Sequence, residues 1–340
     1  MKRERKSLIS VFLFLVACLA TAILMAACTA TPDTPPEATE QNGGNQTNQD
    51  DSIRTIEDMK GSVEIPAHPQ RIVDVSGSAD ELIVLGAPFV GSANTSMFDG
   101  VTVPDYLQSY FAENNIEVVG NYSGSMDLNL EKIAELKPDL IIMNIRHEKV
   151  YDQLKAIAPT AMLSDDINFV NWRGRFQQLG EWLDKQDVVA KWLEDYDTKA
   201  VDLSRKVKDV IGTETVAVIE ANSVHFGSYY IYRTGGPGEL VYDGLGLTPS
   251  SGVPKDVWGE VVDAEYFSMI DADHIFFFSD DGQLGETGDS PAWQGLKAVQ
   301  SGNVYYGLND MQYNMAYTPN GKLLYMERLA NALINHTNVG

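Results

Sequence analysis

The sequence predicts an α/β fold made of two Rossmann-like lobes, each with a mainly parallel sheet, joined by one long backbone helix. Three observations lead to this prediction. Short β-rich runs alternate with helical patterns in both halves of the chain, a long amphipathic segment lies between the halves, and two short motifs recur in both. The predicted parts are an N-terminal segment (1–27), a tether (28–52), an N-terminal lobe (53–170), a linker with the helix (171–211) and a C-terminal lobe (212–340).

The first 27 residues have the composition of an export signal peptide. Four basic residues precede an apolar stretch (8–27) that ends in small residues before Cys28. This end resembles a bacterial lipobox, in which the cysteine is lipidated and becomes the mature N-terminus. A second match ends at Cys18, but cleavage there would leave a further apolar run on the mature chain. A transmembrane helix is the alternative, since about 20 apolar residues can span a bilayer, although a lipid anchor makes it unnecessary.

The tether and the cysteine content set the character of the mature chain. The sequence has 2 cysteines, Cys18 and Cys28, so the body after Cys28 has none. Disulfides and thiolate metal sites are therefore excluded from that body. Residues 29–52 are rich in Pro, Thr, Asn, Gln and Gly and offer almost nothing to bury. We interpret them as a flexible tether between the lipid and the folded body.

The chain is strongly acidic, with a formal net charge of −23. The first 27 residues contribute four basic side chains and one acidic side chain, so the remainder carries −26. A charge of this sign argues against nucleic acid as a partner, because phosphate binding needs basic patches. The simplest interpretation is solubility at a cell surface.

The body contains alternating strand and helix patterns. This alternation is typical of parallel sheets covered by helices. The predicted strands cover residues 71–75, 117–119, 139–144, 215–220, 229–232, 274–279 and 303–306, and the predicted helices cover 79–85, 130–136, 149–157, 260–269 and 321–335.

One helix stands apart by its length. Residues 188–211 contain neither Gly nor Pro, and apolar side chains recur at steps of three and four residues. Such a helix of about 24 residues is roughly 36 Å long. The apolar positions are Val189, Leu193, Tyr196, Ala200, Leu203, Val207 and Val210.

The two halves of the body repeat two short patterns in the same order. Glu131 precedes Asp139 by eight residues, as Glu265 precedes Asp273, and each aspartate opens an apolar strand. Residues 154–157 (LKAI) are matched further on by residues 296–299 (LKAV). The repeats predict two lobes of similar build. Clefts between lobes and the carboxyl ends of parallel strands are where small ligands bind.

The sequence contains no catalytic signature. It has no Walker-type glycine loop, no G-x-S-x-G elbow and no H-E-x-x-H. The glycine-rich residues 235–238 are interpreted as a turn. The histidines are widely separated, so we predict neither an enzyme nor a metal site. They are His68, His147, His225, His274 and His336, of which His274 lies on a predicted buried strand.

Three segments of the body have a recognisable pattern: residues 71–86 (RIVDVSGSADELIVLG), 130–142 (LEKIAELKPDLII) and 146–160 (RHEKVYDQLKAIAPT). Together they resemble the periplasmic-type siderophore and cobalamin binding proteins, and the last is similar to the iron-siderophore branch of Gram-positive bacteria. The resemblance covers about residues 53–335. It implies a monomeric, outward-facing, lipid-anchored receptor of an ABC importer that captures an iron(III)-siderophore complex. It implies no cofactor, because the siderophore itself coordinates the iron.

The resemblance also implies how the receptor docks. In this family one glutamate on each lobe pairs with arginines of the permease. Glu131 and Glu265 match these positions, while Asp263 and Glu260 are neighbours that could substitute for Glu265. Two exposed carboxylates can register a receptor on a basic dimer. Otherwise both are ordinary solvated helix residues.

The predicted ligand site combines arginines with aromatic side chains. Arginine suits an oxygen-rich ligand, since its planar fork donates to several oxygens. Arg146 and Arg233 each follow a predicted strand, and both correspond roughly to ligand-binding positions of the family; the alternative for each is a surface salt bridge. Aromatic rings supply flat contact area, although each is also a candidate for the core. The remaining candidates are Trp172, Tyr230, Tyr232, Tyr313 and Met97, with Arg173 and Arg175 as weaker choices.

Residues 313–321 (YNMAYTPNG) depart from the commonest closing motif of the family. That departure leaves the siderophore type open, and the presence of only two prominent arginines favours a hydroxamate or mixed ligand over a tris-catecholate. A haem or cobalamin receptor of the same class is one alternative. A non-transport sensor is another, and a cell-surface hydrolase on a similar scaffold is a third.

Overall fold

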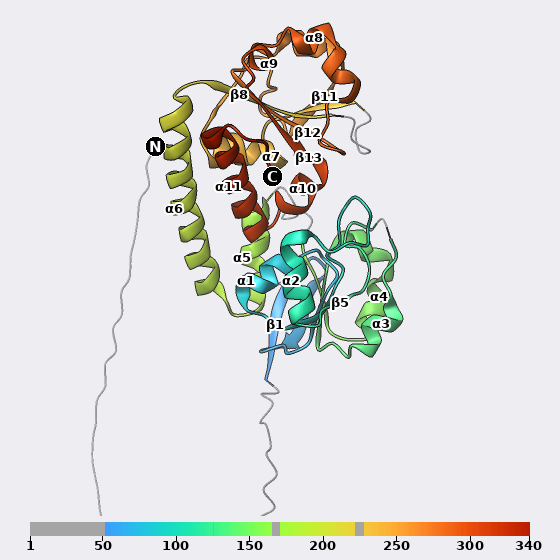
Figure 1. Ribbon diagram of the computed structural model, residues 1–340. Helices are drawn as coiled ribbons and strands as arrows, with labels where there is room; N and C mark the ends of the chain where they lie inside the picture. The colour runs from blue at the N-terminus through green and yellow to red at the C-terminus, as the bar shows by residue number, and fades with distance from the viewer. Residues whose placement is uncertain (1–51, 125, 165–170, 222–227) are drawn as a thin grey trace, which may run out of the picture. The chain divides into compact units, whose positions relative to one another are not determined.

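The computed structural model describes residues 52–124, 126–164, 171–221 and 228–340 (Figure 1). The predicted signal peptide, Cys28, His225 and all of the tether except Ser52 lie outside these residues. Residues 52–340 fall within one compact unit, so the predicted divisions at residues 170 and 211 stay predictions. Among the described residues, no helix combines the length and apolarity that crossing a bilayer requires.

The first large sheet has the order β5-β4-β3-β6-β7, and all of its described strand pairs are parallel. Strand β6, beside the central strand β3, directs alternate side chains into two apolar clusters. Leu140 and Ile142 belong to one cluster, and Ile141 and Met143 belong to the other. Both faces of the sheet are therefore covered, as in other parallel sheets. The strands are β3 (Ile72–Asp74), β4 (Phe89–Ser92), β5 (Glu117–Val118), β6 (Leu140–Met143) and β7 (Thr160–Met162).

An antiparallel hairpin of β1 (Ile53–Asp58) and β2 (Gly61–Pro66) precedes this sheet. It was not among the predicted strands, because its apolar residues are sparse; only Ile56 and Ile65 are buried. The helices of this lobe are α1 (Ala79–Leu85), α2 (Asp105–Glu113), α3 (Leu130–Glu135), the 3-10 helix η1 (Ile145–Val150) and α4 (Tyr151–Lys155).

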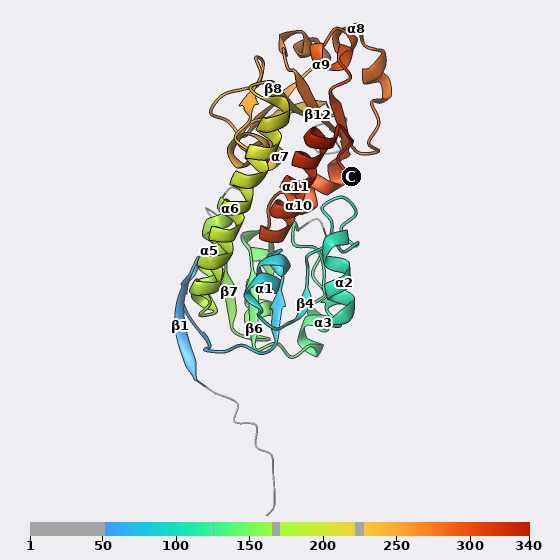
Figure 2. The ribbon, with the colours of Figure 1, turned by 60° about the vertical axis from the view of Figure 1, so that its left-hand side comes forward.

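The predicted long helix is confirmed as α6 (Gln186–Ile211), which has 26 residues and follows α5 (Trp172–Trp182). Most of the predicted apolar positions are buried. Val210 is an exception, because it is 56% exposed and the neighbouring Ile211 is buried in its place. The helix ends before Gly212, whose φ is +61°. Figures 1 and 2 show α6 beside α11 (Pro319–Asn335).

The second large sheet has the order β11-β9-β8-β12-β13, with the short β10 beside β8. The pairs of β8 with β10 and β12, and of β12 with β13, are parallel, whereas β9 is antiparallel to both of its neighbours. Phe277 packs on Trp293 of α8 and Phe278 on Tyr325 of α11, so both faces are covered. The strands are β8 (Thr215–Glu220), β9 (Tyr229–Tyr232), β10 (Thr248–Pro249), β11 (Gly259–Val262), β12 (His274–Ser279) and β13 (Val304–Leu308).

The helix predicted over residues 260–269 is wrong in its first half. That half is strand β11, because the β-branched pair Val261 and Val262 continues the pairing with β9. Asp263 then caps a new turn by accepting a hydrogen bond from the Tyr266 N–H. The glycine-rich turn is largely a helix, since α7 begins at Gly236. The helical elements of this lobe, besides α11, are α7 (Gly236–Glu239), η4 (Leu240–Gly244), η5 (Ala264–Met269), η6 (Gly285–Asp289), α8 (Pro291–Gln294), α9 (Lys297–Gln300) and α10 (Asn309–Met315).

The repeat in the sequence corresponds to a repeat in the structure. Asp139 accepts hydrogen bonds from the N–H groups of Gln70 and Arg71 just before β3. Asp273 accepts one from the N–H of Thr215, at the start of β8 (2.8 Å). Asp139 thus joins β3 to β6, and Asp273 joins β8 to β12. The prediction of two lobes of similar build is confirmed.

The second of these aspartates should contribute measurably to stability. Hydrogen bonding to Lys297 and to the backbone of Thr215 lowers the pKa of Asp273 to about 2. A lowered pKa stabilises the fold above the ordinary value near 4, and this contribution disappears as the pH falls towards 2. We expect Asp273→Asn to reduce the free energy of unfolding by about 1–2 kcal/mol at pH 7.

Urea titrations of both proteins at pH 7 and near pH 3 measure this difference, which should narrow at the lower pH. Asp271→Asn is the control, because that exposed side chain should change stability by less than about 0.5 kcal/mol. If Asp273→Asn lost the same free energy of unfolding at both pH values, the lowered pKa of Asp273 would be contradicted.

Candidate functional site

The carboxyl ends of the parallel strands of the two sheets meet. The loop after β4 supplies Ser96, whose hydroxyl donates to the carboxylate of Asp310 in α10, directly after β13 (2.8 Å). The rings of Phe98 and Tyr313 lie 5.8 Å apart across the same boundary. Ligands of α/β proteins bind at the carboxyl ends of strands, so this edge is the candidate site.

Buried polar side chains hold the loops of the first sheet at this edge. Asp74, at the end of β3, accepts hydrogen bonds from the backbone of Ser76 and Ser78 (2.9 Å each) and is fully buried. Its burial raises its pKa. The side-chain amide of Asn144, directly after β6, donates to the carbonyls of Ser76 and Tyr122. These bonds give the loops a fixed shape before any ligand binds.

Arg146 lies where the sequence predicted it, at the carboxyl end of β6. Its side chain is exposed, and its N–H donates to the cap residue Asn144. It lies near Tyr122, whose pKa is raised to about 12 by burial, with the guanidinium groups of Arg175 and Arg146 acting in the opposite direction. The Tyr122 ring lies against Gly77, where an added Cβ would be 2.6 Å from it. The edge therefore presents a cation whose neighbouring aromatic ring is fixed and buried.

On the second sheet, a buried carboxylate organises the aromatic candidates. Glu220 ends β8 and is fully buried. It accepts hydrogen bonds from the hydroxyls of Tyr232 (2.5 Å) and Tyr313 (2.6 Å) and from the amide of Gln312 (2.8 Å). Burial raises the pKa of Tyr232 well above its ordinary value, so this hydroxyl keeps its proton. Two of the predicted ligand contacts are thus held by a residue that the sequence did not single out.

A second aromatic group, which includes a neighbour of Tyr122 and Tyr313, was also missed. Tyr317 stacks on Trp258 with ring centroids 6.2 Å apart, and both rings are partly exposed. Burial raises the pKa of Tyr317, and its neighbours Tyr313, Glu220 and Tyr122 act in the same direction. An added Cβ on Gly235 would meet the Trp258 ring, so only glycine allows this approach. The sequence did hold a sign of this group, because Tyr317 belongs to residues 313–321, which depart from the commonest closing motif of the family.

The strand position of Arg233 does not by itself support a ligand role. The strand that it follows, β9, runs antiparallel to β8, so its end does not coincide with the carboxyl ends of β8 and β12. The guanidinium of Arg233 lies over the ring of Tyr242 (5.2 Å) and 3.7 Å from the carboxylate of Asp243. Its ligand role stays a prediction, without the support of strand position.

The other predicted contacts are largely covered. Trp172 is 3% exposed, and its N–H donates to Glu239 (3.1 Å). Tyr230 is 8% exposed and Tyr232 1%, so little of either ring can meet a ligand in this conformation. Met97 is partly exposed, and its N–H donates to the side chain of Asn314 in α10 (3.4 Å). Its position between the lobes suits the role predicted for it, which remains untested.

Residues 313–321 also join the lobes through buried polar contacts. Asp80 of α1 is fully buried and accepts hydrogen bonds from the side chain of Asn320 (2.8 Å) and the N–H of Gly321 (3.1 Å), at the start of α11. Arg175 of α5 is 1% exposed and pairs with the fully buried Glu81 (Nε to Oε1, 2.8 Å). Arg175 therefore has a structural role, unlike Arg173, which pairs with Asp197 at the surface.

The two docking candidates occupy equivalent places. Glu131 is in the first turn of α3, where the side chain of Asn129 accepts from the N–H of Lys132. Glu265 is in the first turn of η5, capped in the same way by Asp263. Both glutamates are exposed, so both are accessible to a partner.

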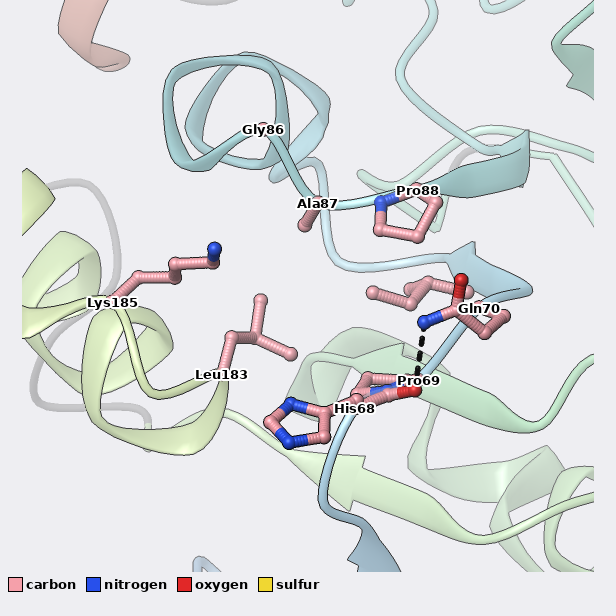
Figure 3. Close-up of a pocket in the computed structure, with 9 residues that line it drawn as sticks. His68, Pro69, Gln70, Gly86, Ala87, Pro88, Leu183 and Lys185 are labelled. Atoms are coloured by element: carbon pink, nitrogen blue, oxygen red, sulfur yellow. Dashed lines mark hydrogen bonds between the residues drawn. The ribbon is translucent and has the colours of Figure 1, made fainter. Parts of the chain in front are cut away.

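A pocket of about 350 Å3 lies at the opposite edge of the first sheet, beside Ile72 at the start of β3 (Figure 3). Lys185 and Leu183 face His68 across it, and the Gln70 amide donates to the carbonyl of His68 (2.9 Å). Because it lies at the amino ends of the strands, this pocket is separate from the candidate site. Within the described ranges, no three His, Cys, Asp or Glu side chains are grouped to hold a metal ion.

Comparisons with known proteins agree with this arrangement. A family model described as "Periplasmic binding protein" matches residues 105–310. The chain is 31% identical to the "Probable siderophore-binding lipoprotein YfiY" of Bacillus subtilis, over 88% of this chain and 90% of that protein. It is 28% identical to the "Iron(3+)-hydroxamate-binding protein YxeB" of the same organism, over 87% of this chain and 88% of that protein. The crystal structure of Staphylococcus aureus SirA complexed with staphyloferrin B is 25% identical, with a TM-score of 0.65, and covers 83% of this chain and 98% of SirA.

Proposed function

The chain belongs to the periplasmic binding protein family, and from this premise we propose that it captures an iron(III)-siderophore complex between its lobes and delivers it to an ABC importer. The observation that carries the proposal is the meeting of the two carboxyl edges, where Arg146 is exposed and Tyr317 is partly exposed. The described relatives are named for siderophores or their iron complexes, which supports the same class of ligand.

The ligand that fits this edge is an oxygen-rich complex with flat or apolar parts. In our proposal the siderophore satisfies the iron, so the protein supplies no metal ligand. The guanidinium of Arg146 would donate to ligand oxygens, and the partly exposed rings of Tyr317 and Trp258 would supply contact area. Tyr313 is 7% exposed and would contribute little. One exposed arginine at this edge suits a neutral or weakly charged hydroxamate or mixed complex better than a tris-catecholate with about three negative charges.

We further propose that the mature protein is a monomer held at the outer face of the cell membrane by a lipid on Cys28. Relatives named as lipoproteins support this placement. The exposed Glu131 and Glu265 would pair with basic residues of the permease. Capture and delivery of this kind need no covalent step, so we assign the protein no reaction.

The proposal is tested by intrinsic tryptophan fluorescence of residues 53–340. The titrants are a ferric hydroxamate, a ferric catecholate, iron(III) citrate, haemin and cobalamin. We expect saturable quenching at submicromolar concentration by one ferric siderophore, because a bound iron complex would lie near Trp258. Free N-acetyltryptophanamide corrects for light absorbed by the complexes.

Two variants make the test specific to the site. Trp258→Phe should lose most of the quenching. Trp182→Phe should keep it, because that indole is buried in the N-terminal lobe and donates to the carbonyl of Glu57. Flat titrations of the folded protein with every ferric siderophore would refute the proposal, and a response to haemin or cobalamin alone would reassign the receptor.

A further inference from the structure

A groove of about 500 Å3 lies on the C-terminal lobe between η5, α8 and α9. Its floor is apolar: Phe267, Ile270 and Leu296 are each at most 4% exposed. Ala292 of α8 lines one wall. The Phe267 ring is also held from below by Tyr229, with the centroids 4.6 Å apart. The groove is therefore a firm depression that could accept a side chain from outside.

The rim of the groove is acidic. Glu265 is two residues before Phe267 on the same turn of η5, and Asp271 lines the groove; both are exposed. The cation of the lining, Lys297, pairs with the carboxylate of Asp273 (2.5 Å), so its charge is largely balanced. A partner segment that fits would carry a basic side chain for the rim and an apolar side chain for the floor.

The internal repeat shows that the two lobes share an apolar floor but differ at the rim. Ile133, Leu136 and Leu154 stand where the groove has Phe267, Ile270 and Leu296. Aligning Glu131 with Glu265 also aligns Asp139 with Asp273. The two lobes then differ at three exposed positions. The N-terminal lobe has one small and two charged residues there, and the C-terminal lobe has one polar, one apolar and one acidic residue. The three pairs are Ala134 and Ser268, Glu135 and Met269, and Lys137 and Asp271, of which Met269 is 57% exposed.

We propose that the groove beside Glu265 receives an apolar side chain of the permease, from the same segment whose basic residue pairs with Glu265. This inference rests on the proposed function, since it concerns the partner of the loaded receptor. The C-terminal lobe then docks by an ionic and an apolar contact. The N-terminal lobe, which has Lys137 where the groove rim has Asp271, docks by an ionic contact alone. The difference fixes which half of the permease each lobe meets.

Filling the groove tests the inference. Ser268 lines it, is exposed, and donates only to the carbonyl of Glu265 within its own turn. Ser268→Trp would occupy the groove, and Ser268→Lys would repel a basic segment. Ala134→Trp is the matched control, because it places the same indole at the equivalent exposed position of the other lobe. Each full-length variant replaces the parent gene in its own host.

The ligand is the iron complex that saturates the parent protein in the fluorescence titrations. Two quantities are measured for each variant: the uptake of iron-55 from this complex by cells, and the affinity of the purified protein for the complex by fluorescence. We expect both Ser268 variants to lose about tenfold or more in uptake while affinity stays within about twofold, and Ala134→Trp to keep uptake within about twofold. Uptake retained by Ser268→Trp, or lost equally by Ala134→Trp, overturns the inference. A parent that no complex saturates refutes the proposed function itself, and the inference with it.

Discussion

Replacing Arg175 by alanine is expected to lower the free energy of unfolding by about 3–5 kcal/mol, because it leaves the carboxylate of Glu81 buried without its cation. The two side chains are 1% and 0% exposed and hydrogen bonded (Nε to Oε1, 2.8 Å). Arg175 also donates to the carbonyl of Tyr317, in the segment that joins the lobes (3.3 Å). Urea unfolding followed by circular dichroism measures the loss.

Arg173 provides the control for this change. It lies two residues earlier in the same helix, but its ion pair with Asp197 is exposed to solvent. Arg173→Ala should therefore cost less than about 1 kcal/mol. Similar losses for the two alanine variants would show that the burial of the Arg175 pair is not what stabilises the fold.

The loss in Arg175→Ala should also depend on pH. Burial raises the pKa of Glu81, and the guanidinium of Arg175 acts against this rise. Without the guanidinium the pKa rises further. A carboxyl whose pKa is raised on folding costs stability as the pH increases above its ordinary value. The free energy of unfolding lost in Arg175→Ala should therefore be smaller near pH 5 than near pH 8.

Reversing the charge of both docking glutamates is expected to reduce iron uptake by about 100-fold or more, because two attractive contacts with basic permease residues would become repulsive. The double variant Glu131→Lys/Glu265→Lys should bind its ferric siderophore as the parent does. Both side chains are exposed, in the first turns of α3 and η5, apart from the carboxyl edges. Cell uptake and fluorescence titration, measured on the same variant, separate delivery from capture.

A control variant must carry the same change of net charge elsewhere. Glu113→Lys/Glu286→Lys alters two exposed glutamates, in α2 and η6, and should keep uptake within about twofold. Equal losses in the two double variants would mean that net charge, and not docking, governs delivery. A loss of ligand affinity in Glu131→Lys/Glu265→Lys would place these residues at the ligand site instead.

Local patterns sufficed for the regular elements. The unbroken apolar spacing of residues 188–211 predicts α6 to within two residues at its start, and β8, β9 and β12 have the predicted bounds. The direction of β9 could not be predicted in the same way, because a strand's composition is the same whichever way it runs. The sequence therefore could not show at which edge of the sheet Arg233 lies.

The buried polar groups were harder to predict, because their partners are distant in sequence. Arg175 and Glu81 are separated by 94 residues, and Glu220 and Tyr313 by 93. In the sequence each is an ordinary polar residue in or beside a helix or strand. Only tertiary packing removes them from water, and only then does pairing become obligatory. The aromatic pair of Tyr317 and Trp258 depends on the same long-range closure.

The caps of α11 come from the other lobe, and this has a consequence for how the protein melts. The N–H of Gly321 and the amide of Asn320 are satisfied by Asp80 of α1. If the N-terminal lobe came apart first, the start of α11 would lose these partners, and the surface it shares with α1 would be exposed. We therefore expect the C-terminal lobe not to stay folded once the N-terminal lobe is denatured. Differential scanning calorimetry should accordingly record a single cooperative transition for residues 53–340 rather than one for each lobe.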